Sequence, residues 1–467
     1  MFLITGGILF CCLTFSDLNV IPRANDYSSS DTGLITDRFY HFSGAGSSEA
    51  SENLTDWEIS KIYTDNIISA ESYPRFFDIY FAGFKKAKAT DDGRVDLSRN
   101  DSTGQGRSRQ IYARTFICTG TDKAVKLAFG YFGAIRIFLN QESVYSGNSS
   151  TGTVMHKDTL YPDLKRGINE LFLVSAETSG SWGFAFKSVP GSGSISEAKK
   201  SPVKLWETKI DGLQPESVVY DPVNDMIYCS QYDSQYGRHG KATGFISRLN
   251  PDGEISDLRW IDSLYAPAGI CLYNRKLYIL ERKTLTVASA DNGEIINRYP
   301  FPEGMFFPND IVSDNAGSLY VTNSAGNTGS ADIFLFKDNH FEEWLGSDDL
   351  SGVNGILYTG NELVIGNSGR GLLQAVDIKT KNIRTIVSVG ASVVDGIEMT
   401  GEGRYLVSTA LTGNLYLVTE PGEIQRVINA GSGFNIANFA YLEDRKLLLI
   451  PTFINGTLQA YFYEPQI

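Results

Sequence analysis

Cysteine and histidine are both scarce in this chain. Its 467 residues include 5 cysteines and 4 histidines. The cysteines outside the N-terminal segment, Cys118, Cys229 and Cys271, lie far apart, and no Cys-x-x-Cys pair occurs. This excludes a disulfide framework and a cysteine-based metal site. We therefore expect a hydrophobic core to stabilise the fold, because a chain of this length can bury a sizeable one.

An excess of positive charge is also missing. Lys and Arg number 41 against 54 Asp and Glu, so the formal net charge is −13. Nucleic acids and anionic membrane surfaces attract basic patches, and we expect neither as a partner. The acidity is compatible with binding a cation. We expect a monomer that takes a small-molecule or carbohydrate-derived substrate.

Long apolar runs are absent apart from one at the N-terminus. The run from Phe2 to Phe15 has the length of a signal-peptide core and is too short to span a bilayer. We predict an export signal at residues 1–20 and therefore a secreted or periplasmic protein. A lipid anchor at Cys11 or Cys12 is the alternative. No other stretch predicts a transmembrane segment.

Glycine and aromatic residues are abundant. The 46 glycines, with 51 Phe and Tyr together, indicate an all-β protein with many tight turns. Residues 21–34 and 188–203 have the composition of linkers, and between them residues 35–187 predict a β-sandwich with a tight hairpin at Asn140-Gln141. This region resembles galactose-binding-like jelly rolls, which implies a jelly-roll topology. The matching residues are Gly167, Asn169, Leu171, Leu173, Trp182, Gly183 and Phe184.

Internal repetition is the strongest signal in the chain. Six segments after residue 204 share a polar residue, a small residue, an apolar strand, a turn and a second apolar strand. The small-residue positions are Ser217, Gly269, Asp310, Gly355, Gly396 and Phe439, with spacings of 52, 41, 45, 41 and 43 residues. A period near this length fits a blade of four short strands, so residues 204–467 predict a six-bladed β-propeller. The stretch "VKLWETKI" is expected to supply the outer strand of the last blade and so to close the ring.

The residue before each small residue forms a column that is expected to line the central channel. This column reads Glu216, Ala268, Asn309, Asn354, Asp395 and Asn438. Five of these positions carry a side-chain oxygen, although their neighbours are apolar. Converging carboxylate and amide oxygens suit a hard cation such as calcium. The alternative for each single residue is a hairpin cap at the channel mouth.

The propeller resembles the regucalcin and gluconolactonase family in residues 204–467, through "PESVVYD", "PNDI", "VNGI" and "VDGI". The resemblance implies one divalent cation, calcium or alternatively zinc or manganese, held by Glu216, Asn354 and Asp395. It places Asn309 beside the metal and the substrate, with Asp310 in the same wall. Two departures bear on specificity: Ala268 offers no ligand, and Phe306-Phe307-Pro308 stands where that family often has an arginine.

The function implied by the resemblance is metal-dependent hydrolysis of a lactone or related ester. Asp395 and Asn309 are then the catalytic residues, and Asn309, Asp310, Arg370 and Tyr232 contact the substrate. Two alternatives stay open: a non-catalytic carbohydrate- or ligand-binding propeller with a structural cation, and a scaffold with no site. Loops after the second strands are expected to form the rim of the channel, with candidates Tyr232, Arg238, Arg282, Asn323, Arg370 and Phe453.

Overall fold

The computed structural model describes most of the chain beyond residue 52. The described ranges are 40–42, 53–64, 72–74, 78–79, 82–90, 93–97, 109–119, 122–149, 158–178, 182–188, 192–193, 201–209, 214–233, 243–324, 332–390, 393–420, 422–430 and 436–465. The predicted export signal, the lipid anchor at Cys11 or Cys12, the first linker and Arg238 lie outside these ranges. Within them, no helix has the length and apolar character needed to cross a membrane.

The N-terminal region is built from short and long strands, as the all-β prediction requires. Sheet order places β5 between β2 and β11, and β11 between β5 and β7. The strands are β1 (Tyr40–Phe42), β2 (Asp56–Ile59), β3 (Lys85–Lys88), β4 (Arg94–Asp96), β5 (Gln110–Thr119), β6 (Lys123–Ala124), β7 (Leu127–Leu139), β8 (Glu142–Ser149), β9 (Asp158–Leu160), β10 (Asp163–Leu164), β11 (Gly167–Ala176), β12 (Gly183–Ser188) and β13 (Ser192–Gly193).

Strand β7 links two sheets of this region. Its first half pairs with β12 and β9, and its second half pairs with β11 and β8. The change occurs at Gly133, which has φ +86. A Cβ at this residue would lie 2.0 Å from the Ala176 carbonyl oxygen. Only glycine fits this bend, because a side chain would collide with the neighbouring strand.

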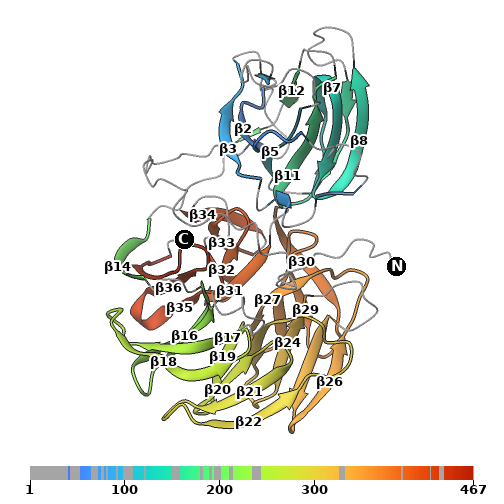
Figure 1. Cartoon of the computed structure of the whole chain (residues 1–467). Helices are drawn as coiled ribbons and strands as arrows, with labels where there is room; N and C mark the ends of the chain where they lie inside the picture. The colour runs from blue at the N-terminus through green and yellow to red at the C-terminus, as the bar shows by residue number, and fades with distance from the viewer. Residues whose placement is uncertain are drawn as a thin grey trace.

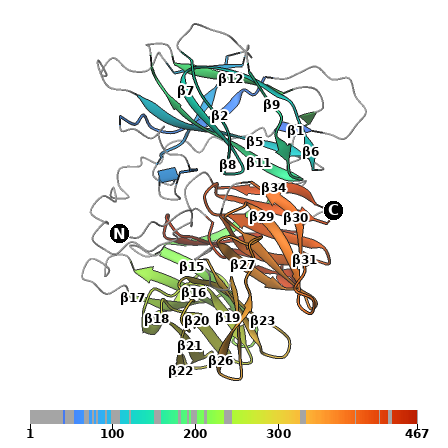
Figure 2. The same ribbon diagram turned by 90° about the vertical axis from the view of Figure 1, so that its right-hand side faces the viewer.

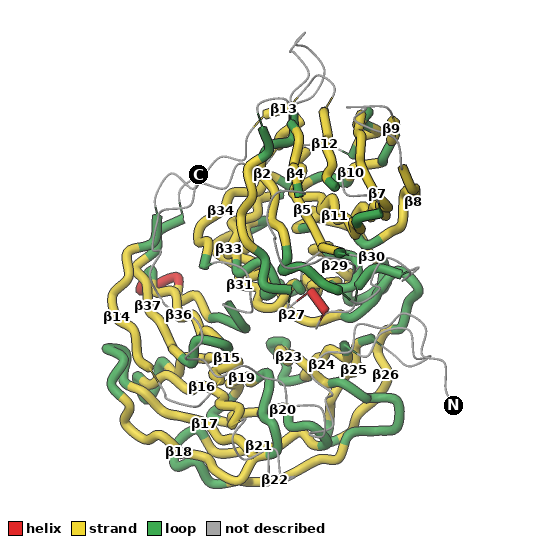
Figure 3. Tube along the Cα trace, turned by 45° about the horizontal axis from the view of Figure 1, so that its top comes forward, coloured by secondary structure: helices red, strands yellow, loops and turns green. Residues whose placement is uncertain are grey.

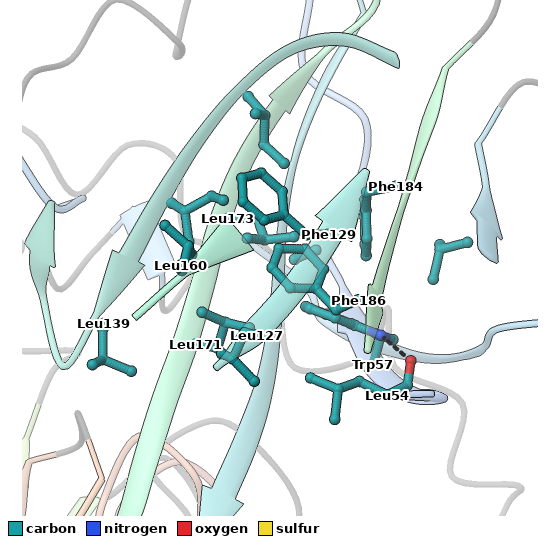
Figure 4. Packing of buried hydrophobic residues seen from close by; sticks show 14 of the residues in the cluster. Leu54, Trp57, Leu127, Phe129, Leu139, Leu160, Leu171, Leu173, Phe184 and Phe186 are labelled. Carbon is teal, nitrogen blue, oxygen red and sulfur yellow. Dashed lines mark hydrogen bonds between the residues drawn. The ribbon is translucent and has the colours of Figure 1, made fainter. Parts of the chain in front are cut away.

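Side chains from both sheets form one hydrophobic core. Figure 4 shows Phe129 of β7, Leu173 of β11 and Phe184 of β12 packed together. Trp57 stacks edge-on against Phe184 with ring centroids 4.7 Å apart, and its Nε1 donates to the Leu54 carbonyl at 2.9 Å. The indole is therefore buried with its one polar atom satisfied, as a core tryptophan requires.

The hairpin between β7 and β8 turns at Asn140 and Gln141, which confirms that prediction. Both residues have positive φ, 48° and 72°, the geometry of a two-residue type I′ turn. Asn169 of the jelly-roll-like motif is fully buried and braces this turn, since Asn140 Nδ2 donates to its Oδ1 at 2.8 Å. The motif therefore marks a local structural brace.

The C-terminal region is a β-propeller. Among the described residues there are five separate four-stranded sheets, and β27–β30 have the same meander order within a larger sheet. Figure 3 shows the innermost strands β15, β19, β23, β27 and β31 around the middle of the ring. The strands are β14 (Val203–Lys209), β15 (Gln214–Asp221), β16 (Met226–Asp233), β17 (Thr243–Leu249), β18 (Ile255–Leu264), β19 (Ile270–Tyr273), β20 (Lys276–Leu280), β21 (Thr284–Ser289), β22 (Ile295–Pro300), β23 (Pro308–Ser313), β24 (Leu319–Asn323), β25 (Ile333–Lys337), β26 (His340–Leu345), β27 (Val353–Tyr358), β28 (Glu362–Asn367), β29 (Leu372–Asp377), β30 (Ile383–Val389), β31 (Val394–Gly401), β32 (Arg404–Thr409), β33 (Asn414–Thr419), β34 (Glu423–Asn429), β35 (Ala440–Leu442), β36 (Leu447–Thr452) and β37 (Thr457–Phe462), with a short 3₁₀ helix, η4 (Glu443–Arg445).

The ring closes through its two ends. Strand β14, which is "VKLWETK", pairs with β37 along its length, in the sheet order β14-β37-β36-β35. This confirms the predicted outer strand. Pairing the first strand of the propeller with the last strand holds the ring shut and covers the edge that β37 would otherwise expose.

The N-terminal region is joined directly to the propeller by a shared sheet. Strand β11 pairs in parallel with β30, and Gly167 and Ile168 face Ser388 and Val389. Figures 1 and 2 both place β11 at the edge of the propeller beside β30. Cys118 and Ile168 are buried in the same apolar cluster as Val387 of β30. Residues from the two regions therefore share one sheet and one patch of core, which the sequence did not predict.

Candidate functional site

The inner ends of successive blades contact one another around the channel. The Gly269 amide donates to the Asn309 carbonyl at 3.0 Å, and a Cβ at Gly355 would lie 1.8 Å from the Asp395 carbonyl. The small residues are needed because the neighbouring backbone fills the space of a side chain. The full series of contacts is Ser217 with Ile270, Gly269 with Asn309, Asp310 with Ile356, Gly355 with Asp395, Gly396 with Phe439, and Asn438 with Glu216.

The predicted column coincides with a repeated irregularity in the inner strands. The pairing of first and second strands shifts register between Pro215 and Val218, and again between Val394 and Ile397. The same shift recurs in β23 and β27. A β-bulge frees a residue from the ladder and redirects its side chain. In these four blades the bulge falls on Glu216, Asn309, Asn354 and Asp395.

Buried hydroxyl groups support three of these bulges, and the sequence analysis missed them. Ser408 Oγ accepts the Gly396 amide at 2.7 Å, and Thr322 Oγ1 accepts the Asp310 amide at 2.9 Å. Ser230 Oγ accepts the Ser217 amide at 3.0 Å in the same way. A buried amide without a partner is costly, so each hydroxyl stabilises the bulge. The signal was a Ser or Thr at the same place in the second strand of these repeats.

Two oxygen atoms in the column are buried without a hydrogen-bond partner: Glu216 Oε2 and Asn354 Oδ1. Glu216 is partly exposed as a residue, while its Oε2 is fully enclosed. Asp395 is 3% exposed, and the Asn354 side chain hydrogen-bonds to it. An orphaned buried acceptor is uncommon in a folded protein and calls for an explanation such as an ion. All three predicted metal ligands therefore lie on innermost strands of their blades, and two of them carry oxygens without a hydrogen-bond partner.

Asp310 is held by three donors and is not free to contact a ligand with its whole carboxylate. Its Oδ1 accepts the Ile311 amide at 2.8 Å and Asn438 Nδ2 at 2.7 Å, and its Oδ2 accepts the Ile356 amide at 3.0 Å. Asp310 is 5% exposed, and Asn309 beside it is 7% exposed. The side chain predicted to contact substrate is thus bound to the protein itself.

Four carboxyl groups of the inner strands have raised pKa values. Burial and the nearby Asp310 carboxylate raise the pKa of Asp395 to about 8, against a hydrogen bond from Asn354. Burial and Asp310 also raise the pKa of Glu398 to about 8. The pKa of Glu216 is raised by burial and by Asp395 and Asp310. Burial raises the pKa of Asp310 itself to about 7. In the absence of a cation, these groups resist ionisation because their charges are desolvated and repel.

The donor set fits a divalent cation bound through oxygen. Glu216, Asn354 and Asp395 provide two carboxylates and an amide oxygen, which are ligands that calcium prefers. In the described residues, no group of three or more His, Cys, Asp and Glu side chains is arranged to hold a metal ion. The predicted set contains only two such residues, so an amide and solvent must complete it. The unsatisfied Glu216 and Asn354 oxygens are the local evidence for this fit.

Five of the six predicted rim residues, all except Arg238, are described, and they occupy different surroundings. Tyr232 lies one residue before the end of β16 and stacks on Phe453 with ring centroids 6.4 Å apart, so two rings from adjacent blades lie side by side. Arg370 Nη2 donates to the Asp348 carbonyl at 2.6 Å. Arg282 lies over the ring of Phe307 at 5.5 Å. Aromatic rings therefore lie at Tyr232 and at Phe307, while Arg370 is engaged with the turn that connects β26 to β27.

Asn323 is a loop brace. It is 1% exposed, its Oδ1 accepts the Phe307 amide at 2.9 Å, and its Nδ2 donates to the Gly304 carbonyl at 3.1 Å. Asn367 does the same in the next blade, where its Oδ1 accepts the Ser351 amide at 3.1 Å. Both are followed by a serine, so the repeated Asn-Ser at the end of the second strand was the sequence signal for this role.

The shifted carboxyl groups predict a pH dependence of stability in the cation-free protein. A carboxyl with a raised folded-state pKa is protonated in the folded protein at pH values where the unfolded chain is ionised. Its stabilising contribution is complete below about pH 4 and is lost as the pH rises through the folded-state pKa values of about 7 to 8. With chelator present, the melting temperature is therefore expected to fall as the pH is raised from about 5 to about 8.

The control for this pH dependence is Glu398→Gln, measured by thermal unfolding across the same pH series. Glutamine removes one ionisable group while keeping a similar shape, so the variant should melt higher than the parent at pH 8 and show a shallower decline. A parent and variant with parallel profiles would contradict the assignment to Glu398. A rise in stability from pH 5 to pH 8 would contradict the whole set.

Comparison with known proteins found similar solved structures at low sequence identity. No protein-family model matches the chain, and no curated protein matches it. A virginiamycin B lyase from Staphylococcus aureus is 14% identical, over 56% of this chain and 99% of that one, with a TM-score of 0.42. A gluconolactonase from Xanthomonas campestris is 16% identical, over 58% and 97%, with a TM-score of 0.43. The nidogen–laminin complex also matches, with 14% identity over 50% and 87% and a TM-score of 0.38.

Proposed function

We propose that the protein is a metal-dependent hydrolase that acts on a lactone or related ester at the mouth of the propeller channel. The observation that carries this proposal is the pair of buried, unpartnered oxygens of Glu216 and Asn354 beside the buried carboxyl of Asp395. Oxygens left without partners among mutually repelling carboxylates are best explained by a cation that they bind.

The proposal includes the architecture around the site. We count β27–β30 as a blade, which brings the total to six, because these strands follow the same four-strand order. Their inner strand contacts both neighbouring blades in the ring. We assign residues 35–187 to a jelly-roll sandwich, residues 188–203 to a linker and residues 204–467 to the propeller. Residues 1–20 would direct the protein to export, as their apolar run supports.

Each polar residue of the site has a role in this chemistry. A bound divalent cation supplies Lewis acidity, which polarises a carbonyl and lowers the pKa of water. Glu216, Asn354 and Asp395 would hold it. Asp395 would also accept the proton of the attacking water, a role that its buried carboxylate could perform in the loaded site. Asn309, on the bulge next to that of Asn354, would orient the substrate carbonyl through its amide.

The proposal is tested by measuring hydrolysis of a panel of sugar and acyl lactones by chelator-treated protein before and after adding Ca²⁺, Mn²⁺ or Zn²⁺. We expect turnover only with an added cation. Turnover that survives chelation would contradict a metal-dependent site. A cation that raises the melting temperature without turnover on any lactone or aryl ester would instead support the non-catalytic, ligand-binding alternative.

A further inference from the structure

Asp310 and Asn438 meet across the central channel. Asn438 Nδ2 donates to Asp310 Oδ1 at 2.7 Å, although the two residues are 128 positions apart. In one direction around the ring, Asp310 contacts Ile356, Gly355 contacts Asp395, and Gly396 contacts Phe439, which follows Asn438. In the other direction, the inner strands of the Gly269 and Ser217 blades lie between the pair. Two inner strands separate the pair on either side, so the bond joins opposite sides of the ring.

The carboxylate of Asp310 occupies a special position in the repeat. Glycine stands at the equivalent places in three other repeats, at Gly269, Gly355 and Gly396. A Cβ at Gly355 would meet the next blade at 1.8 Å, whereas Asp310 sends its side chain toward the Ile356 amide and Asn438. Asp310 therefore connects its own blade to the next blade and to the opposite one, using a single buried group.

The partners of Asp310 adjoin two of the predicted ligands. Ile356 follows Asn354 by two residues in β27, and the Asn438 amide donates to the Glu216 carbonyl at 3.0 Å. Meanwhile the two oxygens of Asp310 are already bound by Ile311, Ile356 and Asn438. A carboxylate with three protein donors is fixed in place, and it fixes the positions of the backbone segments that carry those donors.

We propose that Asp310 and Asn438 form a latch across the central channel, and that Asp310 is a positioning residue that holds the inner strands so that Glu216, Asn354 and Asp395 converge. The proposal rests on the cation site described above for its functional consequence. The latch itself is a structural statement that stands without a cation. This positioning role differs from the substrate contact predicted for Asp310, which stays a prediction.

A charge-preserving exchange tests the latch. Asp310→Asn leaves one acceptor oxygen for three donors, and Asn438→Asp places two carboxylates against each other. The double variant Asp310→Asn with Asn438→Asp restores a donor and an acceptor across the channel with the net charge unchanged. We expect each single variant to weaken Ca²⁺ binding about 10- to 100-fold, the range for groups that orient ligands without touching the metal. The double variant should recover most of this loss.

Binding of Ca²⁺ and of luminescent Tb³⁺ to the full chain is the affinity measurement, accompanied by hydrogen exchange of the Ile356 amide in chelator. We expect faster exchange at Ile356 in Asp310→Asn and recovery in the double variant. If the losses of Ca²⁺ affinity in the two single variants simply add in the double variant, the latch is overturned. If Asp310→Asn does not fold, Asn438→Ala removes only the donor, and unchanged Ca²⁺ affinity in that variant would also overturn the proposal.

The two proposals fail in different ways. If the parent binds neither Ca²⁺ nor Tb³⁺, the proposed function fails, while rescue of Ile356 exchange in the double variant would still support the latch. If the parent binds Ca²⁺ and the double variant is no better than the weaker single variant, the latch fails and the metal site stands. A role confined to overall stability predicts lowered melting temperatures with Ca²⁺ affinity unchanged in the folded single variants.

Discussion

Replacing either carboxylate of the proposed site by its amide should have opposite effects with and without a cation. In chelator at pH 8, Glu216→Gln and Asp395→Asn are expected to melt above the parent, because each removes a buried charge that repels its neighbours. With Ca²⁺ added, the parent should gain stability, about 2.7 kcal/mol at a concentration of 100 times Kd. The variants should gain little, and lactone turnover should be lost. Thermal unfolding with and without Ca²⁺ measures both effects.

A matched control is available at Glu281, a buried carboxylate that already has protein partners. Glu281 is 5% exposed and accepts hydrogen bonds from the Tyr265 amide and the Thr286 hydroxyl. Glu281→Gln should lower stability in chelator, since it turns an acceptor into a donor facing those groups, and it should leave the response to Ca²⁺ intact. The site assignment would be contradicted if Glu216→Gln and Asp395→Asn were destabilising in chelator and still responded to Ca²⁺ as the parent does.

A single methyl group at the junction between the N-terminal region and the propeller should lower the stability of the protein strongly. Gly167 has φ +99, and a Cβ there would lie 1.9 Å from the Ser388 carbonyl oxygen on β30. Gly167→Ala is expected to cost about 1–2 kcal/mol for the positive φ. Displacing β11 from β30 should add about 1–3 kcal/mol of overpacking. Calorimetry should then show a lower first transition, with the N-terminal region unfolding apart from the propeller.

Gly360 provides the control for backbone strain alone. Its φ of +100 is nearly the same as that of Gly167, and no atom lies within 4 Å of the position that a Cβ would occupy. Gly360→Ala should therefore show only the backbone cost and keep the unfolding pattern of the parent. Equal losses in the two variants would mean that the β11–β30 contact contributes nothing beyond local strain, and the shared sheet would not couple the two regions.

The repeat made the channel residues predictable. A side chain alone, such as Asp395 before Gly396, has the appearance of turn chemistry. Its register with Glu216 and Asn354 across a period of about one blade predicts that these residues begin inner strands and face one channel. The same repeat predicted that β14 would pair with β37. Both are properties of the spacing, which any propeller built from these repeats must satisfy.

Other features of the site had weaker signals or none. The hydroxyls of Ser230, Thr322 and Ser408 and the Asn-Ser braces repeat in the sequence, but their roles depend on where bulges leave amides unpaired. The bond between Asp310 and Asn438 has no sequence pattern, because it joins residues that only ring closure brings together. Arg370, in an exposed-looking glycine-rich turn, is occupied by the Asp348 carbonyl.

The sequence by itself determined the all-β class, the propeller repeat and the column of oxygen-bearing side chains, because strand alternation and repeat length are local and periodic properties of the chain. Only the tertiary structure decided that β11 extends the sheet of β30 and that Asp310 reaches Asn438. Pairing between Ile168 and Val389 depends on the free energy of bringing distant edges together. That free energy depends on which edges and donors remain unsatisfied once every blade has formed, and no segment of the sequence contains this information.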